Sequence, residues 1–395
     1  MATIQPFCAL RPNTFYADQL VFGEQVVVLG YGRTEKKLAP LKESLEHAAR
    51  LRPETPEGQE AGYASIDKTL REMLDNGKLW QEQTPGFYVY ETVHGGLQQT
   101  GVWALSSLDD VVKIHEQTFC DSVRRLKNYR ESTGLEGSPI LLTYEPDERI
   151  NRIIRETKAS NNKATMGNAA GMHYLWKIVD PAIIQELTEA FAGISAVYMA
   201  DGHHRLASSA RLLQEQRTRG GKVYDTIASL YMATDQLCIR AYHRVFQPEV
   251  CIERESFFTS LEKEFIIRRS MDNRPIEPET KHHLGMLVRG EWFHLTPRYN
   301  VGPLVDAEIL QKHVLHPVFG ISDPGTDKRM SYIGGRNAME ELLAFMVEYP
   351  CSVAFTLCPV TPQQLMEVAD AGHTLPPKAT WIDPKIPYGL LIYKH

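Results

Sequence analysis

Residues 199–208, MADGHHRLAS, place a carboxylate, two adjacent histidines and an arginine on one short stretch. The run ISAVYMA (194–200) before them has the apolar, β-branched composition of a buried strand, whereas RLASSARLLQEQRTRGG (205–221) is typical of a helix that ends in glycines. Asp201 and Gly202 are therefore predicted to form the turn from strand to helix. A helix start presents unpaired N–H groups and the positive end of the helix dipole, which favour an anion.

Three interpretations of this turn remain open from the residue types alone. In the first, Gly202 lets a phosphate approach the backbone, and His203, His204 and Arg205 donate hydrogen bonds to it. In the second, Asp201 only caps the helix, a contribution of about 0.5–2 kcal/mol, and the histidines face solvent. In the third, the histidines bind a metal ion. We expect no metal site, because side chains of adjacent residues diverge on a helix and no third-ligand motif accompanies them.

Two other segments carry residue types suited to catalysis or substrate binding. Glu116, in VVKIHEQTF (111–119), has the chemistry of a general base toward a hydroxyl group; the alternative is a solvated glutamate that opens a helix. Lys378 and Thr380, in PPKATWIDPK (376–385), are predicted to point to the same side of an extended segment, where they would bind a carboxylate or phosphate. The alternative there is a proline-rich turn.

A fourth, basic pair completes the set of candidate residues. His243 and Arg244, in AYHRVF, lie near a predicted strand end, and we expect them to line a substrate-binding cleft; the alternative is an edge-strand pair that faces water. A shared site requires the side chains of Glu116, Arg205 and Lys378 to converge on one cleft. Groups that act on one substrate must each lie within hydrogen-bond reach of it.

The elements around these residues predict a mixed α/β (α+β) fold. Aromatic and β-branched runs on both sides of His94-Gly95-Gly96 predict a β-hairpin, and SPILLTYEP (138–146) predicts a buried strand. NRIIRETKASNNKATMGNAAG (151–171) is polar and rich in small residues, so we expect a mobile excursion there.

The pattern of elements changes near residues 245–255, where we place a domain boundary. A core over residues 1–248 carries the HEQT and ADGHHR motifs, and an α/β region covers residues 249–395. The PPKATWIDPK segment of that region is predicted to return to the cleft of the core.

Composition and charge narrow the class of protein. The chain has 395 residues, 43% hydrophobic and 23% charged, with a formal net charge of −6 and no long basic block, so we expect no nucleic-acid partner. No segment has the apolar length of a membrane span and the N-terminal residues lack signal-peptide features, so we expect a cytoplasmic protein without a membrane partner. The six cysteines form no CxxC pair, and reduced, mostly buried thiols are expected.

The motifs also occur together in a known family. QPFCALRP, YVYE, HEQT, ADGHHR, YHRV and PPKATWIDPK follow one another from Pro6 to Lys385, nearly the whole chain. In this combination the sequence resembles a widespread prokaryotic family of proteins of unknown function with an ADGHHR signature. That family is in turn similar to free-serine kinases of the ParB/sulfiredoxin-like superfamily. The resemblance implies a ParB/sulfiredoxin-like nucleotide-binding core, an additional α/β C-terminal region, and ATP or ADP with Mg²⁺ as cofactor.

The resemblance also implies roles for single residues. Those kinases use an Asp-Gly-His-Thr-Arg segment at the nucleotide phosphates, a glutamate as base and a Lys-x-Thr pair for the amino acid. By motif, the phosphate-binding residues are Asp201, Gly202, His203, His204 and Arg205, the base is Glu116, and the substrate-binding pair is Lys378 and Thr380. Asp201 and His204 join Glu116 as predicted catalytic residues, although His204 stands where those kinases have threonine.

One segment departs from the family pattern. Most relatives carry Pro-Pro-Tyr-Asp near the start, where this chain reads GEQVVVLGYGRTEKK (23–37). We predict a small-molecule kinase that transfers phosphate from a nucleotide to a hydroxylated metabolite, above all free L-serine, and that is able to form a homo-oligomer. The altered segment keeps a second prediction open, a catalytically inactive nucleotide- or ligand-binding regulator. A metal-dependent phosphoesterase is a weaker third.

Overall fold

The computed structural model describes the 395-residue chain except residues 1, 23–24, 31–32, 47–54, 161 and 169–170. The described chain forms two compact units. Unit 1 comprises Met1–Ile114, Thr118–Leu237 and Pro384–His395, and unit 2 comprises His115–Gln117 and Cys238–Asp383. The sequence pattern divides the chain at residue 248, whereas the contacts divide it between Leu237 and Cys238 and return the last residues to unit 1. The predicted domain boundary at residue 248 stays a prediction.

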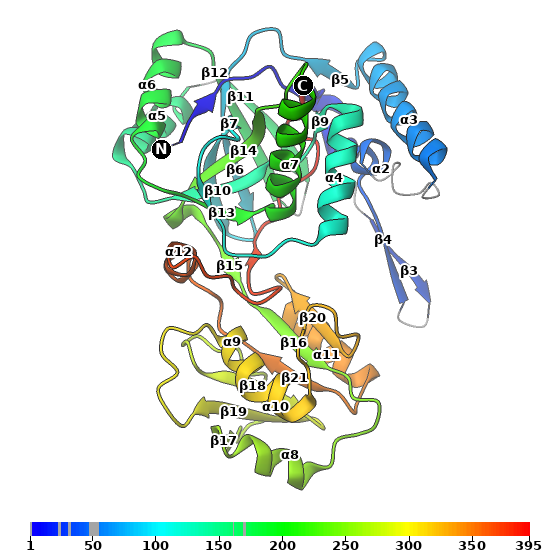
Figure 1. Cartoon of the computed structure of the whole chain (residues 1–395), viewed down its shortest axis with the longest axis vertical. Coiled ribbons are helices and arrows are strands. Elements are labelled where there is room, and N and C mark those ends of the chain that lie inside the picture. The colour runs from blue at the N-terminus through cyan, green and yellow to red at the C-terminus, as the bar shows by residue number, and fades with distance from the viewer. Residues whose placement is uncertain (1, 23–24, 31–32, 47–54, 161, 169–170) are drawn as a thin grey trace. The chain divides into compact units, whose positions relative to one another are not determined.

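Unit 1 is built on a sheet of nine described strands (Figure 1). The strands β10 and β14 pair in parallel, as do β13 and β8, and the other pairs are antiparallel. In spatial order they are β11 (Lys163–Asn168), β12 (Gly171–Ile178), β6 (Phe87–His94), β7 (Leu97–Ser107), β14 (Thr226–Ala233), β10 (Ile140–Tyr144), β13 (Val197–Asp201) and β8 (Val112–Lys113), with β1 (Ile4–Gln5) beside β7. This mixed sheet confirms the predicted mixed α/β class.

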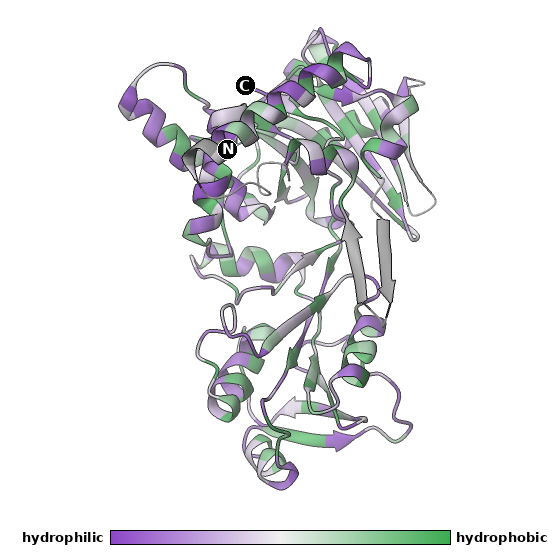
Figure 2. Cartoon of the chain, turned by 90° about the vertical axis from the view of Figure 1, so that its right-hand side faces the viewer, coloured by the Kyte–Doolittle hydropathy of each residue, from purple (hydrophilic) through white to green (hydrophobic). Residues whose placement is uncertain are grey.

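Helices surround the sheet of unit 1, and they carry both hydrophilic and hydrophobic residues (Figure 2). They are α1 (Thr14–Leu20), α2 (Pro40–Leu45), α3 (Pro56–Asp75), α4 (Cys120–Thr133), α5 (Glu148–Lys158), α6 (Pro181–Ala192) and α7 (His203–Arg219), with a 3-10 turn at Thr234–Gln236. Three short pairs complete the unit: β2 (Leu10–Pro12) with β5 (Leu79–Gln81), β9 (Leu135–Glu136) with β23 (Tyr393–Lys394), and β3 (Gln25–Gly30) with β4 (Arg33–Lys37). The predicted hairpin is β6 and β7, and the predicted strand at 138–146 is β10.

The predicted excursion at 151–171 is wrong, because regular elements occupy most of it. Asp147 caps α5 by accepting hydrogen bonds from the backbone N–H groups of Arg149 and Ile150. Ile150, Ile153 and Ile154 lie on one face of α5 and are buried in the core beside strand residues. This i, i+3, i+4 apolar spacing marks an amphipathic helix. The polar residues around the isoleucines obscured it, and strand β11 follows.

Unit 2 contains a six-stranded antiparallel sheet. In spatial order its strands are β17 (Phe265–Arg269), β19 (Glu291–Pro297), β18 (Leu284–Val288), β21 (Val353–Thr356), β16 (Tyr242–Phe246) and β20 (Met330–Gly334). Its helices are α8 (Arg254–Leu261), α9 (Asp306–Leu310), the π-helix Gln311–Leu315, α10 (His316–Phe319), α11 (Ala338–Glu348) and α12 (Pro362–Asp370). Strand β15 (Ile239–Arg240) pairs with β22 (Trp381–Ile382), so the two segments that connect unit 2 to unit 1 run side by side.

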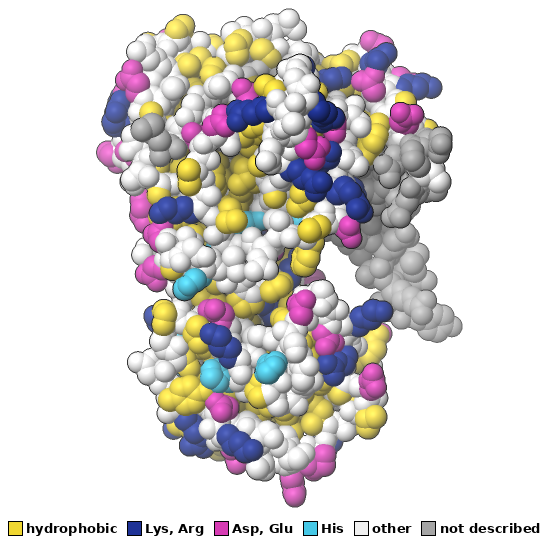
Figure 3. Space-filling view, in the orientation of Figure 1, with side chains coloured by type: hydrophobic (Ala, Val, Ile, Leu, Met, Phe, Trp, Pro, Cys, Tyr) yellow, Lys and Arg dark blue, Asp and Glu magenta, His cyan; other side chains and the backbone are white. Residues whose placement is uncertain are grey.

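The polar surface carries charges of both signs. On the face drawn in Figure 3, Lys and Arg side chains lie among Asp and Glu side chains. Among the helices that the structure describes, none combines the length and the apolar composition needed to cross a membrane.

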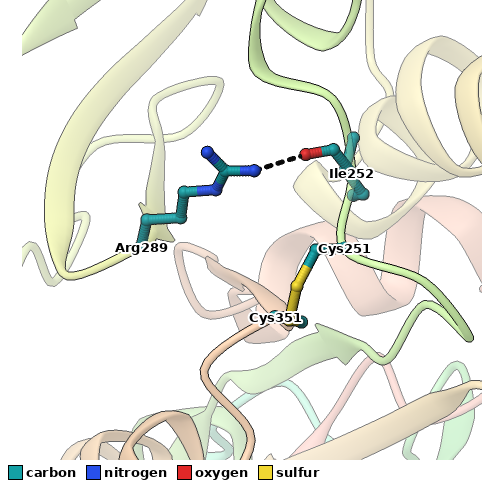
Figure 4. Close-up of a disulfide and its surroundings, with 4 residues drawn as sticks. All are labelled: Cys251, Ile252, Arg289 and Cys351. Atoms are coloured by element: carbon teal, nitrogen blue, oxygen red, sulfur yellow. Dashed lines mark hydrogen bonds between the residues drawn. A yellow bond between two sulfur atoms is a disulfide. The ribbon is translucent and has the colours of Figure 1, made fainter.

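The expectation of reduced, mostly buried thiols is wrong for this structure. Cys251 and Cys351 form a disulfide within unit 2 (Figure 4), and the other four cysteines are free and half-buried or exposed. Beside it, the guanidinium of Arg289 donates a hydrogen bond of 2.8 Å to the carbonyl of Ile252. The sequence did not indicate this pair, because the two cysteines are separated by 100 residues and meet only when β16 and β21 are paired.

We predict that this disulfide stabilises unit 2. A cross-link over a separation of 100 residues restricts the unfolded chain, so replacing both Cys251 and Cys351 with Ser should lower the free energy of unfolding by about 2–4 kcal/mol. Urea unfolding with and without dithiothreitol measures the change. The exposed free thiol supplies the control: Cys120→Ser should keep the sensitivity to dithiothreitol that the double variant loses. Equal stability of the double variant and the wild type would contradict the prediction.

Candidate functional site

Gly202 forms the predicted turn between β13 and α7. Its φ is +103°, in the left-handed region that disfavours residues with a Cβ, and its carbonyl accepts hydrogen bonds from the backbone N–H groups of Arg205 and Leu206. A Cβ at this position would lie 2.8 Å from Nη2 of Arg205. The backbone angle therefore favours glycine, and a side chain here would also have to shift the Arg205 guanidinium.

Asp201, the last residue of β13, carries an ion pair on each carboxylate oxygen. Nη2 of Arg205 donates to Oδ2 at 2.8 Å, and the ammonium of Lys385 donates to Oδ1 at 2.7 Å. Burial alone raises the pKa of Asp201, but the charges of Lys385 and Arg205 outweigh it and lower that pKa to about 2. The cap of α7 is Gly202, without a side-chain cap bond. The interpretation of Asp201 as a simple helix cap is therefore wrong.

The two histidines of the turn have different surroundings. His203 is buried, and its charge when protonated helps to lower the pKa of Asp201. His204 is half-buried; its Nε2 accepts a 3.1 Å hydrogen bond from the backbone N–H of Phe119, and its ring stacks on the Phe119 ring at 5.6 Å. Phe119 caps α4, so His204 connects the starts of α4 and α7. An Nε2 that accepts this bond carries no proton, which favours the Nδ1–H tautomer.

The sequence interpretation missed Lys385 in this site. It lies 184 residues from Asp201, and the only signal was its place at the end of the PPKATWIDPK segment. Together with Arg205 it gives the start of the 17-residue helix α7 a pair of cations. Nε of Arg205 is also buried and has no hydrogen-bond partner among the described residues. The turn thus holds charge-assisted donors next to a helix N-terminus, an arrangement suited to phosphate.

A magnesium ion does not fit the turn as it stands. Magnesium prefers carboxylate oxygens and waters, and Asp201 is the carboxylate that this turn offers. Both of its oxygens already bind cationic side chains, so we derive no step through a metal ion. Within the described part of the chain, no group of three or more His, Cys, Asp or Glu side chains is placed to hold a metal.

In unit 2, the structure brings the Glu116 segment to the Lys378 segment. The backbone N–H of Leu375 donates a 2.7 Å hydrogen bond to the carbonyl of His115, the residue before Glu116. His115 is buried, and Glu116 is half-buried in a loop rather than at the start of a helix. Two of the four segments singled out from the sequence therefore contact each other within one unit.

The Lys378 segment is not extended as predicted. Lys378 has a φ of +58° and lies in a turn, with its ammonium 5.7 Å from the centre of the Tyr242 ring. The ring of Tyr242 in turn packs edge-on against Trp381. Lys378 is exposed and Thr380 half-buried. The alternative interpretation, a proline-rich turn, matches this backbone.

His243 and Arg244 are not edge-strand residues facing water. They lie on β16, which pairs with β20 on one side and β21 on the other, and both are buried. Nδ1 of His243 accepts a hydrogen bond from the backbone N–H of Leu357, and burial together with the charge of Arg244 lowers the pKa of His243 to about 4. His243 is therefore neutral at pH 7.

The predicted residues fall into two groups by unit. Unit 1 holds Asp201 to Arg205, and unit 2 holds Glu116, Lys378, Thr380, His243 and Arg244. The convergence of Glu116, Arg205 and Lys378 on one cleft stays a prediction. The segment that departs from the family pattern, 23–37, lies partly outside the described residues; its described parts pair as β3 with β4.

Comparisons with known proteins agree with the motifs. A family model for a protein of unknown function, DUF1015, matches residues 4–320. A free serine kinase in complex with AMP is similar in structure, with 16% sequence identity and a TM-score of 0.41 over 74% of this chain and 90% of that chain. A mutant of a free serine kinase in complex with ADP has 15% identity and a TM-score of 0.41 over 74% and 91%.

A third similar structure is a conserved hypothetical protein from Pyrococcus furiosus, with 16% identity and a TM-score of 0.39 over 74% of this chain and 95% of that chain. No curated protein matches the sequence. The family model confirms the predicted resemblance to a family of proteins of unknown function.

The buried His243 predicts a pH-dependent stability. Its pKa of about 4 in the folded chain lies below the ordinary value near 6.5, so only the unfolded chain takes up this proton as the pH falls through 6.5. Stability is then lost between pH 6.5 and about 4, at about 1.4 kcal/mol per pH unit. Between pH 7 and pH 5, the wild type should lose about 2 kcal/mol more unfolding free energy than His243→Gln, measured by urea unfolding.

The exposed His373 provides the matched control for this measurement. His373→Gln should follow the pH profile of the wild type. If His243→Gln followed it as well, the proton uptake would belong to another group.

Proposed function

This chain belongs to the DUF1015 family of proteins of unknown function, and from that premise we propose that it is a nucleotide-dependent small-molecule kinase. The observation that carries the proposal is the start of α7, where Arg205 and Lys385 place cationic groups on both sides of Asp201. Phosphate oxygens bind guanidinium and ammonium groups and the free N–H groups of a helix start. The nucleotide phosphates are accordingly assigned to residues 201–205 and Lys385.

The substrate end of the reaction is assigned to unit 2. The hydrogen bond from Leu375 to His115 holds the Glu116 segment against the segment that carries Lys378 and Thr380. An amino acid offers a carboxylate for Lys378 and a hydroxyl group for Glu116, so free L-serine is the substrate we propose.

The proposed reaction is a direct transfer. The hydroxyl oxygen of the substrate forms a bond to phosphorus while the bond between phosphorus and the nucleotide's bridging oxygen breaks. Glu116 accepts the hydroxyl proton, and the nucleotide leaves with one phosphate fewer. Such a reaction needs positioning and charge stabilisation more than covalent chemistry by the protein. ATP and ADP are the proposed donors, and the cytoplasm, where both are supplied, is the proposed location.

A second candidate function rests on the segment at 23–37. It lacks the Pro-Pro-Tyr-Asp of most relatives, which favours a regulator that binds a nucleotide without transferring phosphate. The metal-dependent phosphoesterase has no comparable support, since no metal-binding group is found within the described residues.

One assay separates the two candidates. The purified chain is incubated with ATP or ADP, magnesium and a panel of hydroxylated metabolites that includes L-serine, L-threonine and glycerol. Phosphorylated product is detected by mass spectrometry, and nucleotide binding is measured by calorimetry. Phosphoserine formation supports the kinase, nucleotide binding without any product supports the regulator, and absence of both refutes the phosphate site.

The phosphate site predicts a loss of nucleotide affinity in Arg205→Ala. Removing a charged donor should cost roughly 1.5–3 kcal/mol, equivalent to a roughly 10- to 150-fold weaker Kd, measured by calorimetry. Arg211→Ala is the matched control, because Arg211 lies on the same helix but its Nε binds Glu215 on the exposed surface. Unchanged affinity in a folded Arg205→Ala protein would refute the assignment.

The assignment of Glu116 as the base predicts that Glu116→Gln loses turnover. The amide has nearly the shape of the carboxylate but accepts no proton at neutral pH, so kcat should fall on the order of a hundredfold or more while nucleotide affinity persists. Gln117→Ala, at the exposed neighbouring position, serves as the control in the same assay. Full activity of Glu116→Gln would show that another group accepts the proton.

A further inference from the structure

Arg244 has an unusual set of partners for a buried cation. It lies in the interior strand β16, is 2% exposed, and its guanidinium packs 4.6 Å from the ring of Tyr332. Its Nη1 donates to the carbonyls of Tyr242 and Lys378 at 2.9 Å each, and its Nη2 donates to the carbonyl of Pro377 at 3.0 Å. Within the part of the chain that the structure describes, no carboxylate is among its hydrogen-bond partners.

Burying a cation without a carboxylate partner costs free energy unless its hydrogen bonds stabilise another part of the structure. A charge taken out of water without an opposite charge loses solvation that hydrogen bonds to carbonyls only partly restore. The same burial lowers the pKa of Arg244 to about 10, which still leaves it charged at neutral pH. Two of its three acceptors belong to one short segment, at Pro377 and Lys378. The guanidinium therefore acts mainly on the backbone of that segment.

The segment needs such support because its backbone is strained. Lys378 has a φ of +58°, a conformation that residues other than glycine, asparagine and aspartate seldom adopt and that costs on the order of 1 kcal/mol or more. This angle determines where the Lys378 side chain leaves the turn. Ala379, the next residue, is buried, so the turn is held on that side as well.

The same segment also contacts the loop that carries the proposed base, Glu116. Leu375, two residues before Pro377, donates the hydrogen bond to the carbonyl of His115. A shift of the turn at Pro377–Lys378 would therefore be transmitted in both directions, to the ammonium of Lys378 and to the loop of Glu116.

We infer that Arg244 is a positioning residue: its guanidinium fixes the left-handed turn at Lys378, so that the Lys378 ammonium is presented to the carboxylate of an amino-acid substrate. This inference rests on the proposed function, which assigns the substrate carboxylate to Lys378. Arg244 itself makes no contact with the substrate, because its donors are directed at backbone carbonyls. This positioning role differs from the expectation, drawn from the sequence, that Arg244 lines the substrate-binding cleft.

The test compares Arg244→Ala, Arg244→Lys and the wild type in two measurements. Hydrogen exchange of peptides covering residues 374–383 reports on the turn, and steady-state kinetics with L-serine at saturating nucleotide reports on positioning. In Arg244→Ala, we expect faster exchange and a KM for serine raised by roughly 10- to 100-fold, with a much smaller change in kcat. Arg244→Lys retains a charge but not the forked geometry, so its KM should lie between the two.

Guanidinium ions provide a rescue that a general loss of folding would not show. The deletion in Arg244→Ala leaves room for a free guanidinium, which should lower the raised KM and slow the exchange of residues 374–383. Arg254→Ala is the matched control, since Arg254 lies in the same unit and pairs with Glu291 away from the turn. Its KM and its exchange should equal those of the wild type, and guanidinium should change neither.

The outcomes separate this inference from the proposed function. Faster exchange with an unchanged KM would overturn the inference, because the turn would then not present a substrate-binding group. Unchanged exchange would overturn it as well. If the wild type transfers no phosphate, the proposed function fails, and calorimetric binding of L-serine to wild type and Arg244→Ala replaces KM. Equal serine affinity, or no serine binding to the wild type, then overturns the inference. If Arg244→Ala does not fold, Arg244→Lys decides by the same criteria.

Discussion

The carboxylate of Asp201 holds together the part of unit 1 on which the proposed chemistry depends. It stands at the end of β13, one residue before a glycine with positive φ, and each of its oxygens binds a different cation. Arg205 comes from the next turn of the chain, whereas Lys385 comes from the C-terminal segment of the unit. Without the carboxylate, two cations would face each other and the start of α7, where the helix dipole is also positive. The ion pairs therefore allow a concentrated positive charge to exist in the folded chain.

That balance also explains why the site suits an anion better than a metal ion. The negative charge present is neutralised by two cations, which leaves the turn and the helix start positive overall. A phosphate group can share Arg205 and Lys385 with Asp201, because each cationic group has more than one donor. A metal ion would first have to displace one of them. The electrostatics of the turn, and not the presence of two histidines in sequence, decides between these ligands.

Unit 2 also contains an arginine that holds nearby groups in place, but this arginine binds backbone carbonyls instead of a carboxylate. There a single buried guanidinium stabilises backbone carbonyls, and a lysine in a strained turn is left at the surface. His243, its neighbour on the same strand, stays neutral and accepts a backbone hydrogen bond. The side chains of His243 and Arg244 thus both bind backbone groups inside unit 2. Both units use an arginine to fix the geometry next to a lysine that solvent reaches.

Local pattern was sufficient for much of this architecture. The strand, the glycine turn and the helix around Asp201 follow from apolar runs and turn residues that are adjacent in the chain, as does the hairpin of β6 and β7. The ion pair of Asp201 with Arg205 joins residues four apart, a spacing that local structure itself brings together. The order of motifs was likewise sufficient to indicate the family.

Features that depend on distant pairing were decided only by the tertiary structure. Lys385 reaches Asp201 across 184 residues, and Cys251 meets Cys351 across 100. The burial of His243 and Arg244 follows from β20 and β21 pairing on both sides of β16, which alternation along β16 itself does not specify. At the turn of Lys378, the guanidinium of Arg244 from β16 binds the carbonyls of Pro377 and Lys378 across more than 130 residues of sequence. Residue types and spacing determined which groups are present, but the pairing of distant strands determined which of them meet, because that pairing depends on the packing of the whole unit.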